Sequence, residues 1–339
     1  MPESSISSAD SQQQKNWFSR LGDQPAEAVT IKVVCSHILQ DLDLQGGRAV
    51  TGLETGFYEL DDMTRGLQAG EMIVLASRPS FGKSALVLNI AEHIAVDLKK
   101  PVAFFSIEMS REALALRLLS SRASVDGQRL RKGTLSNAEV QKVQLAALQL
   151  FEAPLYIDDT PALSLEQLIE KCRHMVESGQ ANLIVIDYVH LLEPASDETP
   201  YYKMSRISHC LKSLARSLAV PIIAVAQLRR PIEESMRPRL ADLRDSGTLE
   251  EDADVVLILH REEMRHPQGS ETYEKVKGKA DLIIAKQRNG PVGRIPLTWL
   301  WKYTRFTPAS PREALTSVPT DDYQGAGAVA GDQEAEPPF

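Results

Sequence analysis

The chain has 339 residues, of which 43% are hydrophobic and 25% charged, and its formal net charge is −8. This is the composition of a soluble globular protein of one large or two ordinary domains, and its acidity excludes a general nucleic-acid coat protein but not a local basic loop. The chain has no run of ~20 apolar residues, no signal-peptide pattern and no C-x-x-C pair among Cys35, Cys172 and Cys210, which indicates a cytoplasmic protein without membrane spans, disulfides or a zinc site.

The first 47 residues divide into two parts. Residues 1–25 are rich in Ser, Gln, Asp and Glu, which predicts a disordered arm. Residues 26–47 form a predicted helix with apolar residues at helical spacing, ended by a Gly-Gly pair; the stripe comprises Ile31, Val34, Cys35, Ile38, Leu39 and Leu42. One short amphipathic helix cannot bury its own apolar stripe, so it must pack on its own domain or on a neighbouring subunit.

From residue 48 to 308 the pattern predicts one α/β domain. Strands are expected at 71–76, 101–106, 154–158, 182–188 and 221–226, and helices at 83–98, 111–121, 136–150, 165–178 and 201–219. Continuous Val/Ile runs with short connections indicate a buried, mostly parallel sheet flanked by helices. Further strands at 254–259, 279–285 and 292–301, with few helices between them, predict an antiparallel extension at one edge. Residues 309–339 are small, polar and acidic, which predicts a disordered tail.

Between the first strand and its helix lies a candidate phosphate-binding loop. Its residues would turn tightly and present backbone N–H groups to an anion: Arg78, Pro79, Ser80, Phe81, Gly82, Lys83, Ser84 and Ala85. Lys83 would reach the β- and γ-phosphates of a nucleotide, and the Ser84 hydroxyl would bind Mg²⁺. Ser77 stands where the motif G-x-x-x-x-G-K-[ST] has its first glycine, so an ordinary strand-to-helix turn with a surface lysine is the alternative.

Polar residues follow three other predicted strands, at the edge where parallel sheets bind ligands. Glu108 comes just after the strand 101–106, Asp187 lies near the end of 182–188, and Gln227 follows 221–226. Asp187 could hold Mg²⁺ through water, and Glu108 could orient and deprotonate an attacking water. Gln227 suits a sensor of the γ-phosphate. Such residues also cap helices or face solvent, but three of them beside the loop predict a nucleotide triphosphate hydrolysis site.

Six blocks, in this order, give the chain a family resemblance between residues 51 and 306. They are Arg78-Pro79-Ser80-Phe81-Gly82-Lys83-Ser84, Phe105-Ser106-Ile107-Glu108-Met109, Ile186-Asp187-Tyr188, Ala226-Gln227-Leu228, Asp242-Leu243-Arg244-Asp245-Ser246-Gly247 and Lys286-Gln287-Arg288-Asn289-Gly290-Pro291. The sequence resembles the ATPase domain of DnaB-type replicative helicases, which are RecA-like P-loop NTPases. This family often has another residue in place of the glycine at the Ser77 position.

The resemblance implies a hexameric ring around single-stranded DNA, with ATP sites between subunits. Lys286 and Arg288 would then supply cationic side chains to the γ-phosphate on the neighbouring subunit; without the resemblance they are surface charges. It also implies DNA contacts in two stretches, through Arg229, Arg230, Arg239, Arg244, Asp245 and Gly247. The arginine-rich stretch could instead be a solvated loop balanced by Glu233 and Glu234.

The sequence departs from the family pattern at three places. His190 stands where the family usually has Gln, and Asp245 is a shorter acid than usual. The family normally carries an N-terminal helical domain that binds primase, whereas only residues 1–47 precede the ATPase domain here. The helix at 26–47 resembles the family's linker helix, which docks on the adjacent subunit. Ring assembly is therefore expected, and primase recruitment in the usual way is not. A helicase loader or other replication proteins are candidate partners.

The function expected from these observations is that of an ATP-dependent, hexameric 5′→3′ DNA helicase that uses Mg·ATP during DNA replication. Two alternatives belong to other classes: a DNA-dependent ATPase of the RecA recombinase type, which forms filaments, and a non-unwinding ring or assembly module gated by ATP. Glu108, Lys286 and Arg288 argue against an inactive enzyme. The stretch from Arg244 to Gly247 argues for contact with DNA.

Overall fold

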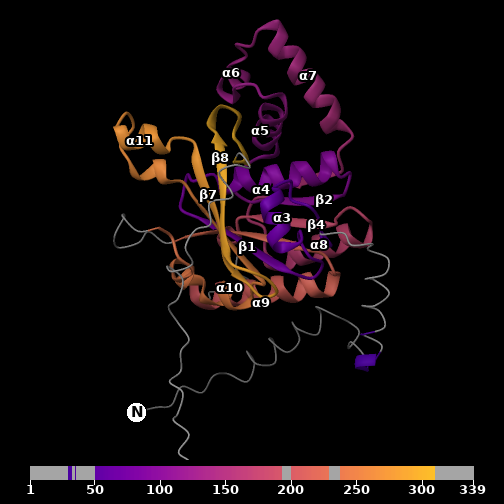
Figure 1. The fold of residues 1–339 in the computed structure, drawn as a ribbon. Coiled ribbons are helices and arrows are strands. Elements are labelled where there is room, and N and C mark those ends of the chain that lie inside the picture. The colour runs from indigo at the N-terminus through magenta and orange to yellow at the C-terminus, as the bar shows by residue number, and fades with distance from the viewer. Residues whose placement is uncertain (1–29, 33–34, 36–49, 193–199, 229–236, 310–339) are drawn as a thin grey trace, which may run out of the picture.

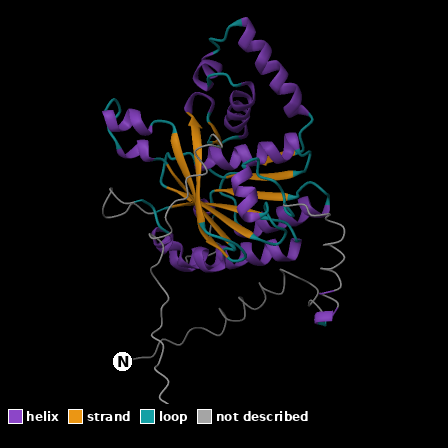
Figure 2. Ribbon diagram, in the orientation of Figure 1, coloured by secondary structure: helices purple, strands orange, loops and turns teal. Residues whose placement is uncertain are grey.

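The computed structural model describes residues 30–32, 35, 50–192, 200–228 and 237–309. Within these residues nine strands form one sheet in the order β3-β2-β4-β5-β1-β6-β7-β8-β9 (Figure 1). The strands are β1 Met72–Ser77, β2 Val102–Ser106, β3 Leu155–Asp158, β4 Leu183–Asp187, β5 Ile222–Gln227, β6 Val255–His260, β7 Lys279–Gln287, β8 Gly293–Leu300 and β9 Arg305–Pro308. The predicted α/β sheet is therefore confirmed, and helices lie on both of its sides (Figure 2).

The sheet is parallel from β3 to β6 and antiparallel from β6 to β9. The prediction that residues 254–259 run antiparallel is wrong: β6 pairs in parallel with β1, with Ile73 opposite Val255 and Ser77 opposite Leu259. The direction reverses only between β6 and β7. The crossover that returns the chain to the starting edge includes helix α10, Gly247–Asp252, which is only six residues long. A helix this short leaves little periodicity in the sequence, so the connection resembled a loop.

Each face of the sheet is covered by its own set of helices (Figure 1). Met72, Val74 and Ala76 of β1 belong to the core beneath α8 (Leu165–Glu177), α9 (Pro200–Leu218) and α10. Ile73 and Leu75 belong to the core beneath α3 (Tyr58–Thr64), α4 (Lys83–Glu92) and α5 (Arg111–Ala123). Successive strand residues point to opposite faces, so a strand buried on both needs a continuous apolar run.

Three helices project beyond the sheet at the top of Figure 1. They are α5, α6 (Gly127–Lys132) and α7 (Asn137–Phe151), which enclose a small separate core around Ala123, Val125 and Ala146. A capping box between Ser136 and Glu139 begins α7. A second projection, between β6 and β7, contains the 3₁₀ turn η4 (Glu262–Arg265) and α11 (Glu271–Val276). The predicted helix 83–98 continues past α4 as a π-helical turn, η1, His93–Asp97.

Several predictions fall on residues outside the described ranges. These are the arm 1–25, nearly all of the tail 309–339, and Arg229 and Arg230. Of the helix expected at 26–47, the structure describes Thr30, Ile31, Lys32 and Cys35, which are exposed, and the last three are helical. Cys172 and Cys210 are buried free thiols, whose pKa values burial raises. Within the described ranges, no helix combines the length and apolar character needed to cross a membrane.

Candidate active site

The loop between β1 and α4 has the shape of a phosphate cradle. Gly82 precedes the first residue of α4 with φ of 99°, and Ser80 also has a positive φ of 67°. A Cβ at Gly82 would lie 3.0 Å from the ring of Phe306 in β9. Both the backbone conformation and the close ring therefore require glycine, which leaves the backbone N–H groups at the start of α4 open to an anion.

Ser77 explains why the first glycine of the motif is dispensable here. It is the last residue of β1 and is fully buried, in extended register with Gln227 on one side and Leu259 on the other. Its hydroxyl donates to the carbonyl of Arg78 at 2.9 Å. Because the backbone at this position is extended, a side chain is accommodated without strain.

Residues from β6, β8 and β9 support the loop from the side. The Phe81 ring stacks on His260 with centroids 5.8 Å apart. Arg261 donates through Nη1 to the carbonyl of Ser80 at 3.4 Å, and its guanidinium lies 4.9 Å from the ring centroid of Trp299. Glu263 pairs with the Arg261 guanidinium and holds it in place. Sequence reasoning missed these residues, because Arg261 is 181 positions from Ser80 and Trp299 is farther still.

Lys83 and Glu108 meet at the carboxyl edge of the sheet. Lys83 Nζ is 3.8 Å from Glu108 Oε2, and it also lies 4.8 Å from the ring centroid of Tyr188. The Lys83 side chain is 10% exposed and that of Glu108 is 49% exposed. The ammonium group is thus sheltered inside the loop, while the carboxylate can reach solvent and an approaching water.

Asp187 ends β4 one strand away, with Ser106 of β2 as its register partner. It is 1% exposed, and neither Oδ atom has a hydrogen-bond partner among the described residues. Burial raises the pKa of Asp187; the Ser84 hydroxyl and the Lys83 ammonium oppose the rise, although Ser84 stops short of hydrogen-bond geometry. A buried, unpartnered carboxylate beside a hydroxyl fits a hydrated divalent cation.

The rest of such a cation's shell would have to come from phosphate and water. Nowhere in the described part of the chain do three or more His, Cys, Asp or Glu side chains gather in a way that could hold a metal ion. Mg²⁺ commonly binds through one or two carboxylates together with nucleotide phosphates and water. The oxygen donors of Asp187 and Ser84 fit this mode of Mg²⁺ binding.

Gln227 completes the row of polar groups along this edge. It ends β5, between β4 and β1 in the sheet, and is partly exposed. The order β2-β4-β5-β1 therefore brings Glu108, Asp187 and Gln227 next to the loop, as expected from the sequence. The individual roles of these residues stay predictions.

Two further charged or titratable residues lie near this site. Burial lowers the pKa of Arg117 in α5, whereas the neighbouring carboxylates of Asp187 and Glu108 raise it. Burial, with help from Lys203 and Lys83, lowers the pKa of His190 to about 4, so its ring is neutral at physiological pH. Arg117 was missed by sequence reasoning; its only signal is a charge within an Ala/Leu-rich helix.

Lys286 and Arg288 are not part of this arrangement. The N–H of Arg288 donates to the carbonyl of Asp254, and the N–H of Asp254 donates to the carbonyl of Met72. Arg288 is therefore level with the first residue of β1, whereas the loop follows the last, roughly 16 Å along the strand. Within one chain the two predicted halves of the site therefore lie at opposite ends of the parallel strands.

The predicted DNA-contacting residues are described only in part. Arg239 is exposed, and its N–H donates to Asp242 Oδ2 at 2.8 Å. The backbone of Arg244 and Asp245 lies in the 3₁₀ segment η3, Leu240–Ser246, and Gly247 begins α10. Side chains from 244 to 247 lie outside what the structure describes, so their contacts stay predictions.

A mostly parallel sheet, a loop ending in Gly82-Lys83-Ser84 and a buried acid at the end of β4 define a RecA-like P-loop NTPase fold. The family model named DnaB-like helicase C terminal domain matches residues 52–308. The chain belongs to this family.

Named relatives and solved structures agree with that assignment. The chain is 40% identical to the replicative DNA helicase DnaB of Geobacillus stearothermophilus over 274 residues, covering 80% of this chain and 59% of that protein. It is 39% identical to the replicative DNA helicase DnaC of Bacillus subtilis, again over 274 residues, with the same coverage of each. One solved ATPase domain is similar with a TM-score of 0.77 at 31% identity, covering 84% of this chain and all of that domain. A DnaB-like replicative helicase studied with primase gives 0.74 at 30% identity, over 90% of this chain and 72% of that one.

The chain thus spans about three fifths of the length of the curated relatives it matches.

Proposed function

We propose that the protein is an ATP-driven DNA helicase motor that works as a homo-hexameric ring in the cytoplasm during DNA replication. The observation that carries this proposal is the division of the site. The carboxyl ends of the parallel strands carry Lys83, Glu108 and Asp187, while the amino ends carry Lys286 and Arg288. A site split in this way is complete only when a second copy brings its opposite edge to the loop.

The near half of the site would bind Mg·ATP and prepare the attacking water. Backbone N–H groups of the loop 78–85 and the Lys83 ammonium would hold the phosphates. Asp187 and Ser84 would hold Mg²⁺, which supplies charge neutralisation for the transferred phosphoryl group. Glu108, half exposed and next to Lys83, would orient the water and accept its proton, and Gln227 would sense the γ-phosphate.

The far half would act on the neighbour's nucleotide. Lys286 and Arg288 would approach the γ-phosphate of the adjacent subunit and stabilise the negative charge of the transition state. Cationic residues supplied by a partner in this way accelerate such reactions by about 10³–10⁵. Hydrolysis would then depend on contact between subunits.

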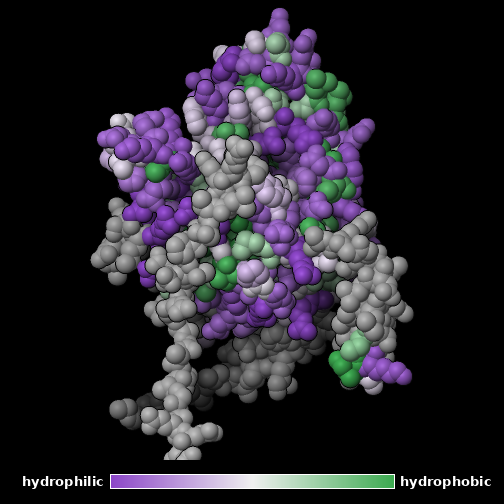
Figure 3. Space-filling model, in the orientation of Figure 1, coloured by the Kyte–Doolittle hydropathy of each residue, from purple (hydrophilic) through white to green (hydrophobic). Residues whose placement is uncertain are grey.

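An exposed apolar face of α7 supports assembly. Leu145, Leu148 and Phe151 are 64%, 60% and 80% exposed and lie at helical spacing, so they share one side of the helix. Figure 3 shows apolar side chains at the upper right, over α7. We infer that the apolar stripe of the helix at 26–47, where Ile31 is 76% exposed, packs there on a neighbouring copy.

Single-stranded DNA would pass through the ring beside residues 229–247. The arginines proposed for contact there, together with Asp245 and Gly247, would follow the phosphate backbone, which suits a motor that moves without reading sequence. A loader that places the ring on DNA is the partner this assembly requires.

One combined experiment tests the proposal. The full chain is assayed for ATP hydrolysis with and without single-stranded DNA and for unwinding of a forked duplex, while the mass of the assembly is measured. Stimulated hydrolysis, unwinding with 5′→3′ polarity and a six-subunit mass are expected. Filaments on DNA in place of closed rings would favour the recombinase type instead, and a ring that hydrolyses ATP without DNA stimulation would favour an assembly module.

A further inference from the structure

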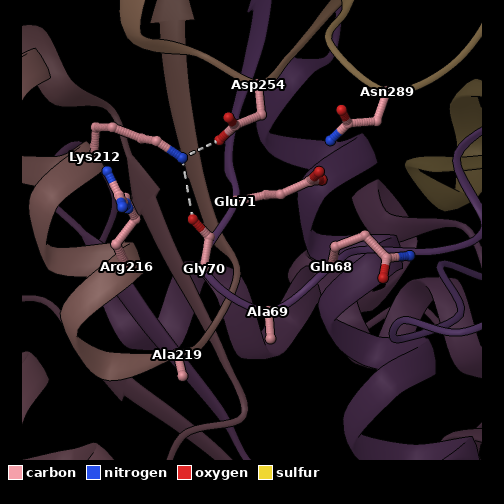
Figure 4. A pocket seen from close by; sticks show the side chains of 9 residues that line it. All are labelled: Gln68, Ala69, Gly70, Glu71, Lys212, Arg216, Ala219, Asp254 and Asn289. Carbon is pink, nitrogen blue, oxygen red and sulfur yellow. Dashed lines mark hydrogen bonds and ion pairs between the residues drawn. The ribbon is translucent and has the colours of Figure 1, made fainter. Parts of the chain in front are cut away.

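Asp254 lies where the helix α10 passes into the strand β6, and its carboxylate is held from two sides. The side chain is 8% exposed. Its Oδ2 accepts from the N–H of Met72 at 2.8 Å and from Lys212 Nζ at 2.5 Å. Figure 4 shows Lys212 reaching from α9 to Asp254 and to the carbonyl of Gly70 across the hollow at this edge. One carboxylate oxygen is therefore fixed to β1 and α9.

The other carboxylate oxygen and the backbone carbonyl of Asp254 contact Arg288. Oδ1 is 3.4 Å from Arg288 Nη1, and the backbone carbonyl accepts from the N–H of Arg288 at 2.9 Å. Arg288 is thus bound by Asp254 through both backbone and side chain, although its own side chain is 45% exposed. The guanidinium is therefore held within its own chain and is still exposed enough to meet another subunit.

The end of α10 binds the same pair of cations. Lys286 Nζ donates to the carbonyls of Glu250 and Glu251 at 2.5 and 3.1 Å, and Arg288 Nη2 donates to the carbonyl of Glu251 at 2.8 Å. The last carbonyls of a helix have no partner inside it and carry partial negative charge, which favours cations.

The helix α10 is itself tied to α9. Ser208 Oγ lies 2.9 Å from the carbonyl of Thr248 and 2.6 Å from Asp252 Oδ2, and His209 Nδ1 lies 2.7 Å from the same oxygen. These contacts reach both ends of a helix of six residues. The two cations are therefore docked on a short element that is held along its whole length.

We propose that Asp254 is a positioning residue for Arg288, a role that rests on the proposed function in which Arg288 acts on the neighbour's nucleotide. Anchored by Met72 and Lys212, Asp254 sets the point from which the guanidinium reaches across the subunit boundary. The helix α10 begins at Gly247, at the end of the stretch proposed to contact DNA. A shift of that stretch would therefore also shift Lys286 and Arg288, which are docked on α10. A merely structural Asp254 would join α9 to β1 and affect only its own subunit.

The variant Asp254→Asn separates these roles. Asparagine has the same shape, and its amide oxygen still accepts from the Met72 N–H, so chiefly the charge is lost. We expect kcat for DNA-stimulated hydrolysis to fall by about 10- to 100-fold, as misplaced groups do. KM for ATP and the Kd for an oligonucleotide should stay within about twofold of wild type.

The matched control is Asp281→Asn. Asp281 pairs with Arg294 at 2.7 Å and its side chain is 14% exposed, but it lies near the start of β7, opposite Pro296 of β8 and away from Arg288. It should keep the wild-type kcat, and melting temperatures of both variants show whether either fold is damaged. Equal kcat in Asp254→Asn and Asp281→Asn would overturn the positioning role.

Mixed rings provide the decisive readout. Asp254→Asn subunits have an intact loop, and Lys83→Ala subunits have intact cations, so mixing the two should restore DNA-stimulated hydrolysis. No recovery would mean that Asp254 serves its own subunit, which contradicts the proposal. If Asp254→Asn does not fold, Asp254→Glu, which displaces the charge by one methylene, decides in the same assays, and wild-type kcat there would equally overturn the role. A wild-type chain without DNA-stimulated hydrolysis would instead refute the proposed function itself.

Discussion

Lys83 and Glu108 form an ion pair at the mouth of the phosphate loop, with Nζ and Oε2 3.8 Å apart. Lys83 begins α4, and Glu108 follows β2, which is separated from β1 by β4 and β5 in the sheet. The pair places a sheltered cation for phosphate directly beside a carboxylate that can reach water. Binding and water activation are thus assigned to neighbouring side chains with different exposure.

Replacing Glu108 with Gln should abolish turnover while preserving nucleotide binding. The amide cannot accept a proton from water, and general bases contribute about 10²–10⁴ in rate. Steady-state hydrolysis and binding of a fluorescent ATP analogue measure the two effects separately. Glu112→Gln, at an exposed acid in the first turn of α5, is the control and should behave like wild type. A comparable loss in both variants would contradict the role of Glu108.

Lys83→Ala and Arg288→Ala should each abolish hydrolysis, because the first removes phosphate binding and the second removes charge supplied to the neighbour. Mixing the two inactive proteins should restore part of the activity. Some boundaries between subunits in the mixed ring then combine an intact loop with an intact Arg288. If hydrolysis in the mixture equals the sum of the separate residual rates, the assignment of Arg288 to the neighbouring site is wrong.

Gly82→Ala should destabilise the ligand-free fold and prevent nucleotide binding. A Cβ there would meet both the positive φ and the Phe306 ring at 3.0 Å. The strained backbone alone costs about 1–2 kcal/mol in the free energy of unfolding. The control is Gly133→Ala. Gly133 also has a positive φ, of 67°, but a Cβ there would meet nothing within 4 Å, so this variant measures the backbone strain alone. Urea denaturation should show a larger loss for Gly82→Ala than for Gly133→Ala.

Asp187→Asn should stabilise the ligand-free protein and abolish Mg²⁺-dependent hydrolysis. Asparagine leaves a polar group in the same place but removes its charge, so the desolvation cost of the buried carboxylate is relieved. Because burial raises the pKa of Asp187 above its ordinary value of 3.8, the wild-type protein loses stability as pH rises through that raised pKa. The difference between variant and wild type should therefore shrink at acidic pH, where Asp187 is protonated. Melting temperatures across pH, with and without Mg·ATP, measure both effects; a destabilised variant at neutral pH would refute the argument.

Much of the architecture could be predicted from local pattern. Apolar β-branched runs marked β1, β2, β4 and β5 within one or two residues, because strands buried on both faces leave a continuous signal. The edge strand β3 was marked equally closely, although its residues are only partly buried. Gly82-Lys83-Ser84 and the polar residues at the ends of β2, β4 and β5 were also visible, since parallel topology brings strand ends to one edge. The parallel direction of β6 was not visible, because the short α10 hides the crossover.

The sequence by itself therefore determined the alternation of strands and helices, the loop and the acids around it, because each depends on residues that are neighbours in the chain. Only the tertiary structure decided that Phe306, Trp299 and Arg261 enclose the loop. It alone placed Lys286 and Arg288 on the end of α10, at the edge opposite Lys83. Those relationships depend on strand order and register, which arise from packing between distant segments and leave no periodic trace in the sequence.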